Sequence, residues 1–171
     1  MNKRDLSNSL SLVNRDWNEA TLCPPEKRTN AQCQILVQSD ALIAELKCAD
    51  IVIVGAPMYN FSIGTGLKAW IDLIVLAGEP FKYTQSGPIG LLSDKPVYII
   101  ITTGGTVLGG NFDYASNYLT HIFRFMGINN LTIIDDAKYN TNNSDDTLQN
   151  HKKIRDRLIT PNLLPLLRFR R

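Results

Sequence analysis

The chain has 171 residues, of which 44% are hydrophobic and 20% are charged, and its formal net charge at neutral pH is only +2. This composition is typical of one globular domain, residues 1–171, and such a small charge excludes a strongly basic nucleic-acid-binding protein. No apolar run approaches the roughly 20 residues of a membrane-spanning helix, so we expect neither nucleic acid nor membrane as a partner. The three cysteines form no CxxC pair and no secretory signal is evident, which predicts reduced thiols in the cytoplasm. His121 and His151 lack neighbouring ligand residues, which argues against zinc.

The first elements are a polar segment and a helix. Residues 1–28 are polar and irregular, and we interpret them as a loop. Thr29 and Gln32 have the spacing of a capping box, which predicts a helix that begins after Thr29. Its buried stripe is expected to consist of apolar residues at helical spacing: Ile35, Leu36, Leu42, Ile43 and Leu46.

Three apolar runs predict strands, at residues 51–57, 96–102 and 131–134. The first is a continuous β-branched run, which is typical of a strand buried on both faces in a parallel sheet. Helices are predicted at residues 66–77, at residues 114–126 with Gly127 just beyond the end, and at residues 145–158. Residues 78–90 form a longer connection, and residues 160–171 form an irregular basic tail. Strands that alternate with helices predict a three-layer α/β fold with a doubly wound parallel sheet and right-handed crossovers.

Two loops follow neighbouring strands of this predicted sheet. One carries an amide between two aromatic residues, in the sequence Met58, Tyr59, Asn60 and Phe61, and the other is Thr102, Thr103, Gly104 and Gly105. Ligands of open parallel sheets bind at the carboxyl ends of the strands. Backbone N–H groups there can donate to the carbonyls of a planar ring, and paired glycines allow a close approach. Each loop alone is equally compatible with an ordinary turn between a strand and a helix, but together they favour a planar cofactor.

Five separate stretches, in the same order along the chain, resemble the FMN-dependent NADH:quinone reductases known as bacterial azoreductases. They are residues 39–47, 56–61, 81–84, 87–91 and 123–128, and the resemblance extends from about residue 4 to residue 139. It implies a flavodoxin-like fold and a homodimer with FMN at the interface between the subunits. It also implies that two electrons pass from NADH through flavin N5 to quinones or aromatic azo compounds, by a ping-pong route.

The resemblance also implies roles for particular residues. The family's flavin-ring loop corresponds to Met58, Tyr59, Asn60 and Phe61. Its second flavin loop corresponds to Thr102, Thr103, Gly104 and Gly105, with Thr103 in place of an arginine. Tyr83 and Phe125 correspond to positions near the substrate, although aromatic residues at such positions are as often part of the core. We expect no catalytic side chain, because the flavin carries out the chemistry.

The sequence departs from the family at its beginning. The family opens with a strand, a serine-rich phosphate-binding loop, a helix and a second strand, and none of these has a counterpart here. We therefore expect an incomplete flavodoxin-like domain that lacks strands 1 and 2 and the first helix. Residues 51–56 would then form an open edge of the sheet, and FMN would lose the cradle of its phosphate.

This departure leaves an alternative function open. The alternative is a truncated, non-catalytic remnant, or a partner subunit of a full-length homologue, with impaired FMN binding. A flavodoxin-type electron carrier is a third reading. The slightly basic composition disfavours it, because such carriers are usually strongly acidic.

Overall fold

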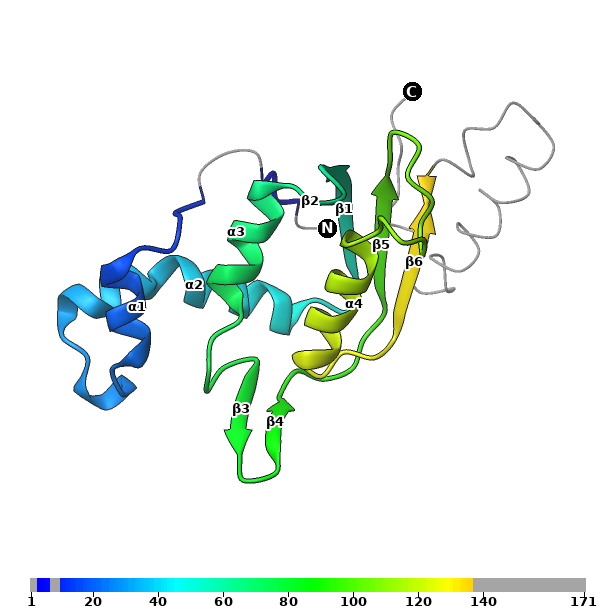
Figure 1. Ribbon diagram of the computed structural model, residues 1–171. Coiled ribbons are helices and arrows are strands. Elements are labelled where there is room, and N and C mark those ends of the chain that lie inside the picture. The colour runs from blue at the N-terminus through cyan, green and yellow to red at the C-terminus, as the bar shows by residue number, and fades with distance from the viewer. Residues whose placement is uncertain (1–2, 7–9, 137–171) are drawn as a thin grey trace.

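The computed structural model describes residues 3–6 and 10–136, which form an α/β structure (Figure 1). Its sheet contains three parallel strands, namely β1 (Val52–Tyr59), β5 (Val97–Thr102) and β6 (Leu131–Asp135). A two-residue strand, β2 (Ser62–Ile63), pairs antiparallel with the end of β1, so the strand order is β2-β1-β5-β6. The predicted α/β class and the three predicted strands are confirmed, with shifts of one or two residues at their ends.

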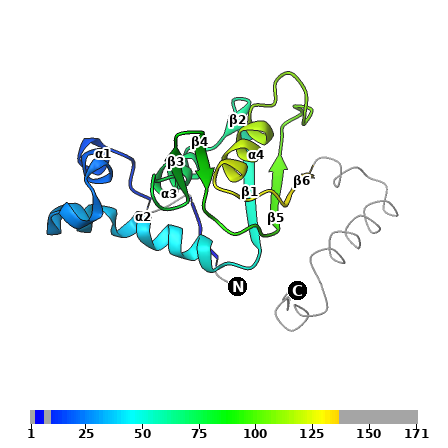
Figure 2. The same ribbon diagram turned by 90° about the horizontal axis from the view of Figure 1, so that it is seen from below.

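Three helices, α2 (Asn30–Cys48), α3 (Thr65–Ile74) and α4 (Ala115–Phe125), lie on one face of the sheet (Figure 2). Their apolar stripes form a single core with the sheet residues that point toward them. The completely buried members of this core include Ile99 and Ile101 of β5 and Leu119 and Phe123 of α4.

The other face of the sheet is less covered among the described residues. In β1, Val54 and Ala56 are buried, whereas Ile53 is 52% exposed and Gly55 is also exposed. The expectation that residues 51–57 are buried on both faces is therefore wrong for this strand. Successive residues of a strand point to opposite faces, and the described helices cover only one of them. The predicted helix at residues 145–158 and the predicted tail at 160–171 lie outside the described residues.

The outer edge of β1 is largely unpaired within the described chain. From Val52 to Pro57 the strand pairs with β5 on one side. On the other side it pairs only with β2, at Met58 and Tyr59. Among the described residues, this part of β1 therefore has a partner strand on one side only. The edge is apolar and uncharged, the kind of edge that other chains can extend.

The prediction that residues 1–28 are a loop is wrong for part of that segment. Helix α1 (Arg15–Leu22) and the short 3-10 helix η1 (Pro25–Lys27) lie there. Asn14 caps α1 by accepting the backbone N–H of Trp17 at 2.9 Å. The indole of Trp17 then donates to the Ser39 hydroxyl of α2 at 3.1 Å, and Ala20 is completely buried. This docking compensates for the weak apolar pattern of the segment.

Helix α2 begins as predicted and faces the core almost as predicted. Thr29 and Gln32 form the capping box. The predicted stripe is buried at Leu36, Leu42, Ile43 and Leu46, but Ile35 is 38% exposed. Ser39 occupies the inward position next to Leu36 and Leu42. It is completely buried, and its hydroxyl is satisfied by the hydrogen bond from Trp17 of α1.

The end of α2 is tied to the beginning of β5 by one lysine. Lys95 is only 9% exposed, and its ammonium group donates to the carbonyl oxygens of Leu46 at 2.9 Å, Lys47 at 3.0 Å and Ala49 at 2.7 Å. The last carbonyls of a helix have no partner within the helix and carry partial negative charge. A buried cation is therefore well placed at this position.

Residues 78–90 contain a hairpin that the sequence did not reveal. Its strands are β3 (Phe81–Thr84) and β4 (Gly87–Gly90). The hairpin packs against the end of α4, where a Cβ built on Gly90 would meet the backbone nitrogen of Gly127 at only 2.2 Å. Gly127 has a φ of 105°, which confirms the predicted left-handed residue beyond α4. None of the helices in the described residues is both long and apolar enough to cross a membrane.

Candidate functional site

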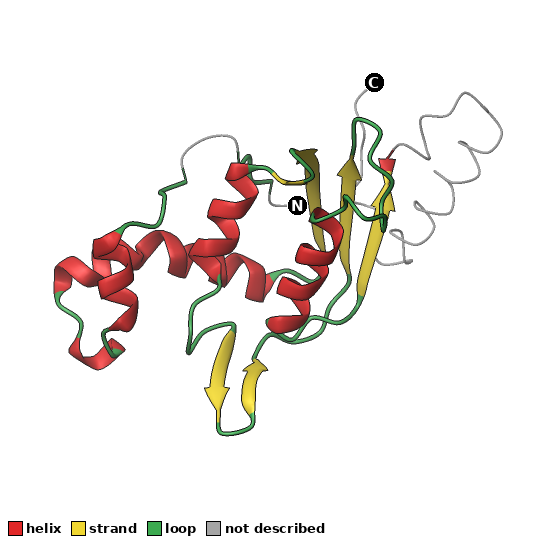
Figure 3. Cartoon of the chain, in the orientation of Figure 1, coloured by secondary structure: helices red, strands yellow, loops and turns green. Residues whose placement is uncertain are grey.

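The two predicted loops lie next to each other at the carboxyl ends of β1 and β5 (Figure 3). The first is the turn between β1 and β2, and the second continues from Thr102 toward the beginning of α4. A hydrogen bond joins them, from the backbone N–H of Tyr114 to the carbonyl oxygen of Phe61 at 3.0 Å. The structure therefore brings the two predicted loops into one site.

The turn between β1 and β2 has an unusual backbone. Tyr59 pairs with Ser62, and the two residues between them have positive φ values, 47° for Asn60 and 69° for Phe61. Two positive φ values in a two-residue hairpin loop are typical of a type I′ turn, which prefers glycine at the second position. A phenylalanine there costs on the order of 1–3 kcal/mol. Such strain persists only where the surroundings enforce it, and it is frequent at binding sites.

Two contacts hold Phe61 in this conformation. One is the hydrogen bond from Tyr114, and the other is the ring of Phe112, whose centroid lies 5.7 Å from that of Phe61. The Phe61 side chain nevertheless remains 50% exposed, and Tyr59 is 62% exposed. The turn therefore presents aromatic side chains to solvent while its backbone is fixed.

The second loop leaves open space in front of its glycines. A Cβ built on Gly104 or Gly105 would meet no atom within 4 Å. The Thr103 hydroxyl braces the loop by donating to the carbonyl of Thr106 at 2.9 Å, and it accepts the N–H of Gly105 over a long 3.4 Å. Thr103 thus has a structural role in this loop, and that role does not need the positive charge of the arginine found at this position in the family.

A cavity of about 410 Å³ opens between the two loops. It is lined by Phe61, Gly104, Gly105, Thr106, Val107, Gly110, Asn111 and Phe112. All of these residues are uncharged, and the glycines leave backbone exposed beside aromatic side chains. Such a surface suits a flat ring whose edge accepts hydrogen bonds.

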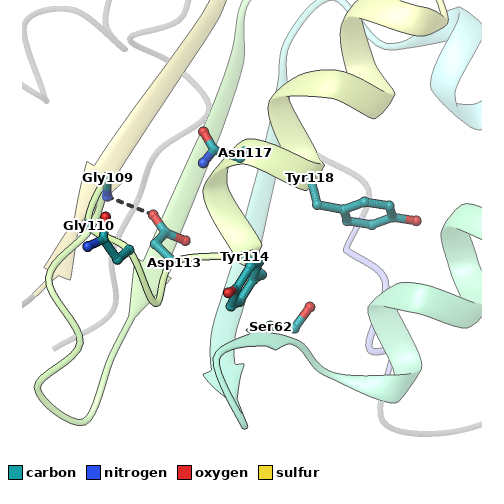
Figure 4. Close-up of a pocket in the computed structure, with 8 residues that line it drawn as sticks. Ser62, Gly109, Gly110, Asp113, Tyr114, Asn117 and Tyr118 are labelled. Carbon is teal, nitrogen blue, oxygen red and sulfur yellow. Dashed lines mark hydrogen bonds between the residues drawn. The ribbon is translucent and has the colours of Figure 1, made fainter.

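A second cavity, of about 640 Å³, adjoins the first and shares Gly110 and Asn111 with it (Figure 4). It is lined by Ser62, Gly109, Gly110, Asn111, Asp113, Tyr114, Asn117 and Tyr118. Burial raises the pKa of Tyr118, and the nearby Asp72 adds to this effect while Lys68 opposes it. The lining is polar, mostly through hydroxyl and amide groups.

Asp113 organises the loop between these cavities. Its carboxylate is 2% exposed and accepts the backbone N–H groups of Gly109 at 2.8 Å, Ala115 at 3.0 Å and Ser116 at 2.9 Å, together with the Ser116 hydroxyl. Burial alone would raise the pKa of Asp113, but these hydrogen bonds outweigh it and lower the pKa. Asp113 therefore acts as an ionised cap of α4 rather than as a proton donor.

Tyr83 and Phe125 are not at this site. Tyr83 lies on β3 and Phe125 at the end of α4, at the opposite end of the sheet from the two loops (Figure 1). Phe125 packs on Phe81 with ring centroids 4.5 Å apart, and Tyr83 meets the same ring at 5.3 Å. Tyr83 is 72% exposed. Within one chain, the two residues predicted near the substrate belong to an aromatic cluster between the β3–β4 hairpin and the end of α4.

The sequence did not predict two residues that line these cavities, Phe112 and Asp113. Asp113 has a recognisable signal, since an aspartate three residues before Ser116 fits a helix cap. Phe112 has none, because only the folded loop brings it to Phe61.

Comparison with known proteins shows the family and the fold of the chain. Residues 2–158 match the family described as having the flavodoxin-like fold. FMN-dependent NADH:quinone oxidoreductase 1 of Colwellia psychrerythraea is 40% identical over 151 residues, which cover 88% of this chain and 79% of the relative. The chain belongs to the flavodoxin-like family of FMN-dependent NADH:quinone oxidoreductases. The protein of the same name from Hahella chejuensis is 42% identical over 132 residues, which cover 77% of this chain and 65% of the relative.

Solved structures of azoreductases have the same fold. An azoreductase from Bacillus anthracis superposes with a TM-score of 0.74 at 24% identity, covering 91% of this chain and 78% of that one. An FMN-dependent NADH-azoreductase from the same species, determined in complex with FMN, has a TM-score of 0.72 at 24% identity, with 91% and 77% covered. The chain thus spans about two thirds to four fifths of the length of these family members.

Proposed function

We propose that the protein is an FMN-dependent NADH:quinone oxidoreductase that also reductively cleaves aromatic azo compounds. The observation that carries this proposal is the cavity between Phe61 and the glycine pair, at the carboxyl ends of two adjacent parallel strands. It supports the proposal because it lies in the two loops that the resemblance assigns to the flavin ring. Relatives about 40% identical bear the name of this activity.

The residues of the two loops fit the ring of FMN. Met58, Tyr59, Asn60 and Phe61 would border it from the β1–β2 turn, and Thr102, Thr103, Gly104 and Gly105 would approach it with their backbone. The open space in front of Gly104 and Gly105 gives room for a ring edge. Bound FMN would be the electron carrier between NADH and the acceptor, transferring two electrons.

The contribution of the chain itself is orientation and electrostatics. The strained turn at Asn60 and Phe61 is held by a hydrogen bond from Tyr114 within the chain itself, which favours binding with little ordering of the turn. Backbone N–H groups of the glycine loop are suited to stabilise negative charge that develops at a ring edge. Asp113 keeps the loop in place, since its carboxylate holds both Gly109 and the first turn of α4. No side chain of the site is assigned a proton transfer.

We further propose that the protein is a homodimer in the cytoplasm. Tyr83 and Phe125 lie far from the two loops of their own chain, so they can approach a ligand there only if a second copy presents them. The high exposure of Tyr83, 72%, is compatible with such a role. Sedimentation velocity with and without FMN tests the dimer, and a monomer under both conditions would contradict it.

Gly104→Ala is the sharpest test of the flavin site. Its Cβ would project into the open space of the cavity without touching the protein, so the fold should be unaffected and FMN affinity should fall. Gly55→Ala is the matched control, because a Cβ on that strand glycine also meets nothing within 4 Å. The readouts are quenching of FMN fluorescence, thermal unfolding, and NADH-dependent bleaching of an azo dye. A folded wild-type protein that neither binds FMN nor bleaches the dye would refute the proposal.

The open edge of β1 favours one alternative, a partner subunit of a full-length homologue. An apolar strand with one edge left unpaired by the described residues is suited to accept a strand from another chain. Co-expression with a tagged full-length relative would then yield a stable heterodimer, whereas recovery of the chain only in its own homodimer would reject the alternative.

A further inference from the structure

Phe112 extends the aromatic wall that Phe61 forms in the cavity between the two loops. It lies in the loop before α4, more than forty residues from the β1–β2 turn, and its ring approaches that of Phe61 with centroids 5.7 Å apart and planes inclined by 40°. Its side chain is 65% exposed even though it is large and apolar. Neither ring is used to fill the core, since neither residue belongs to the core cluster.

The remaining walls of this cavity are uncharged. Val107, which is 74% exposed, adds apolar surface, and the glycines add bare backbone. The nearest buried charge in the adjoining loop is the Asp113 carboxylate, whose oxygens accept four hydrogen bonds within the protein. Exposed aromatic walls with an uncharged lining suit a flat, uncharged aromatic ring, because such a ring loses no ionic hydration when it leaves water.

We propose that Phe112 is a binding residue of the site. Its ring and that of Phe61, which contact each other, form one continuous aromatic wall of a slot whose remaining lining includes the glycine loop, and this slot takes a flat, uncharged aromatic ring. This inference rests on the proposed function and deepens it. The ring can have two sources, the ring system of FMN itself or that of an uncharged acceptor such as a quinone. The chemistry of the slot is the same in both cases.

Phe112→Ala tests the slot, with Phe112→Tyr and Phe112→Leu as matched controls. Because the side chain is largely exposed, its removal should lower thermal stability only slightly, through the lost contact with Phe61. Loss of the Phe112 part of the aromatic wall should weaken binding by about tenfold, Tyr should retain affinity, and Leu should restore only part of it. Binding is measured as the Kd of FMN, by fluorescence quenching, and as the Kd of naphthoquinone on the oxidised, FMN-loaded protein, by calorimetry.

Comparison of the Kd of FMN with the Kd of naphthoquinone identifies which ring the slot binds. A weaker FMN complex in Phe112→Ala assigns the slot to the flavin, and a weaker naphthoquinone complex with unchanged FMN affinity assigns it to the acceptor. Unchanged values for both ligands would overturn the proposal, as would full recovery with Leu, because stacking would then have no role. A naphthoquinone sulfonate should bind more weakly than naphthoquinone, and equal affinity would overturn the preference for an uncharged ring.

If the proposed flavin function is wrong, the binding experiments give a result that differs from failure of the Phe112 proposal. A wild-type protein that binds no FMN would refute the flavin function directly. The slot would then be tested through naphthoquinone binding to the protein without FMN, with the same three variants.

Discussion

Replacement of Lys95 by methionine removes the ammonium group and keeps a side chain of similar length. In the native protein this group holds the carbonyls of Leu46, Lys47 and Ala49 at the end of α2, directly before β1. Methionine would leave all three oxygens without this donor. The Leu46 carbonyl is in the most buried of the three hydrogen bonds, so water can replace the lysine least well at that position.

The magnitude follows from the exposure of each contact. The buried bond to Leu46 contributes roughly 1.5–3 kcal/mol, as is usual for a hydrogen bond to a charged group. The two partly exposed bonds add about 0.5–1 kcal/mol together, because water can satisfy most of what they lose. The favourable field at a helix carboxyl terminus adds about 0.3–1 kcal/mol. Relief of the desolvation of the buried cation offsets part of this sum. Lys95→Met should therefore destabilise the fold by about 2–4 kcal/mol, a large share of the usual 5–15 kcal/mol.

Urea unfolding followed by tryptophan fluorescence measures this loss, since Trp17 and Trp70 both pack against the core. The urea concentration at the midpoint of unfolding should fall. The slope of the free energy of unfolding against urea concentration should stay constant. Lys27→Met is the matched control, because Lys27 is exposed at the end of η1, and it should change stability by less than about 0.5 kcal/mol. A loss below about 1 kcal/mol in Lys95→Met would show that water replaces the ammonium at all three carbonyls, which would refute the reasoning.

Three further predictions concern the loops and turns. The lowered pKa of Asp113 means that its contribution to stability is complete above the unfolded value of about 3.9 and is lost as the pH falls through the lower folded value. Asp113→Asn should accordingly lower Tm at neutral pH and show a shallower loss of Tm below about pH 4, and parallel pH profiles would contradict this. Phe61→Gly should stabilise the fold by about 1 kcal/mol, by relief of the positive φ, yet weaken FMN binding; denaturation together with FMN titration checks both signs. Gly127→Ala should cost at least about 1 kcal/mol in urea unfolding, because its φ is 105° and its Cβ would meet the Leu92 carbonyl oxygen at 2.8 Å, whereas Gly55→Ala should not.

The elements that the sequence predicted well depend on local signals. The Thr29–Gln32 capping box and the left-handed Gly127 involve neighbouring residues only, and both are present in the structure. The β-branched runs gave the three parallel strands for the same reason. The positions of the two loops followed from the strands, because parallel strands place their carboxyl ends on one side of a sheet.

The features that were missed depend on contacts between distant segments. The helix at Arg15–Leu22 has a weak apolar pattern and is stabilised by the docking of Trp17 on Ser39. The β3–β4 hairpin depends on the close approach of Gly90 to Gly127. The exposure of Ile53 depends on which face the helices cover, and a strand sequence does not contain that information. The same holds for Phe112, whose place beside Phe61 exists only in the folded chain.

The hydrogen bond from Tyr114 to Phe61 also has a consequence for the order of assembly. It joins segments that precede and follow β5 in the sequence, so the cavity is complete only when β1 is paired with β5 and α4 is docked. Formation of such non-local contacts must overcome the entropy of closing the intervening loop. A ligand of this cavity would therefore recognise only the completed tertiary structure, and its binding would shift the folding equilibrium by mass action. Occupancy of the site would thus report on the integrity of the whole sheet.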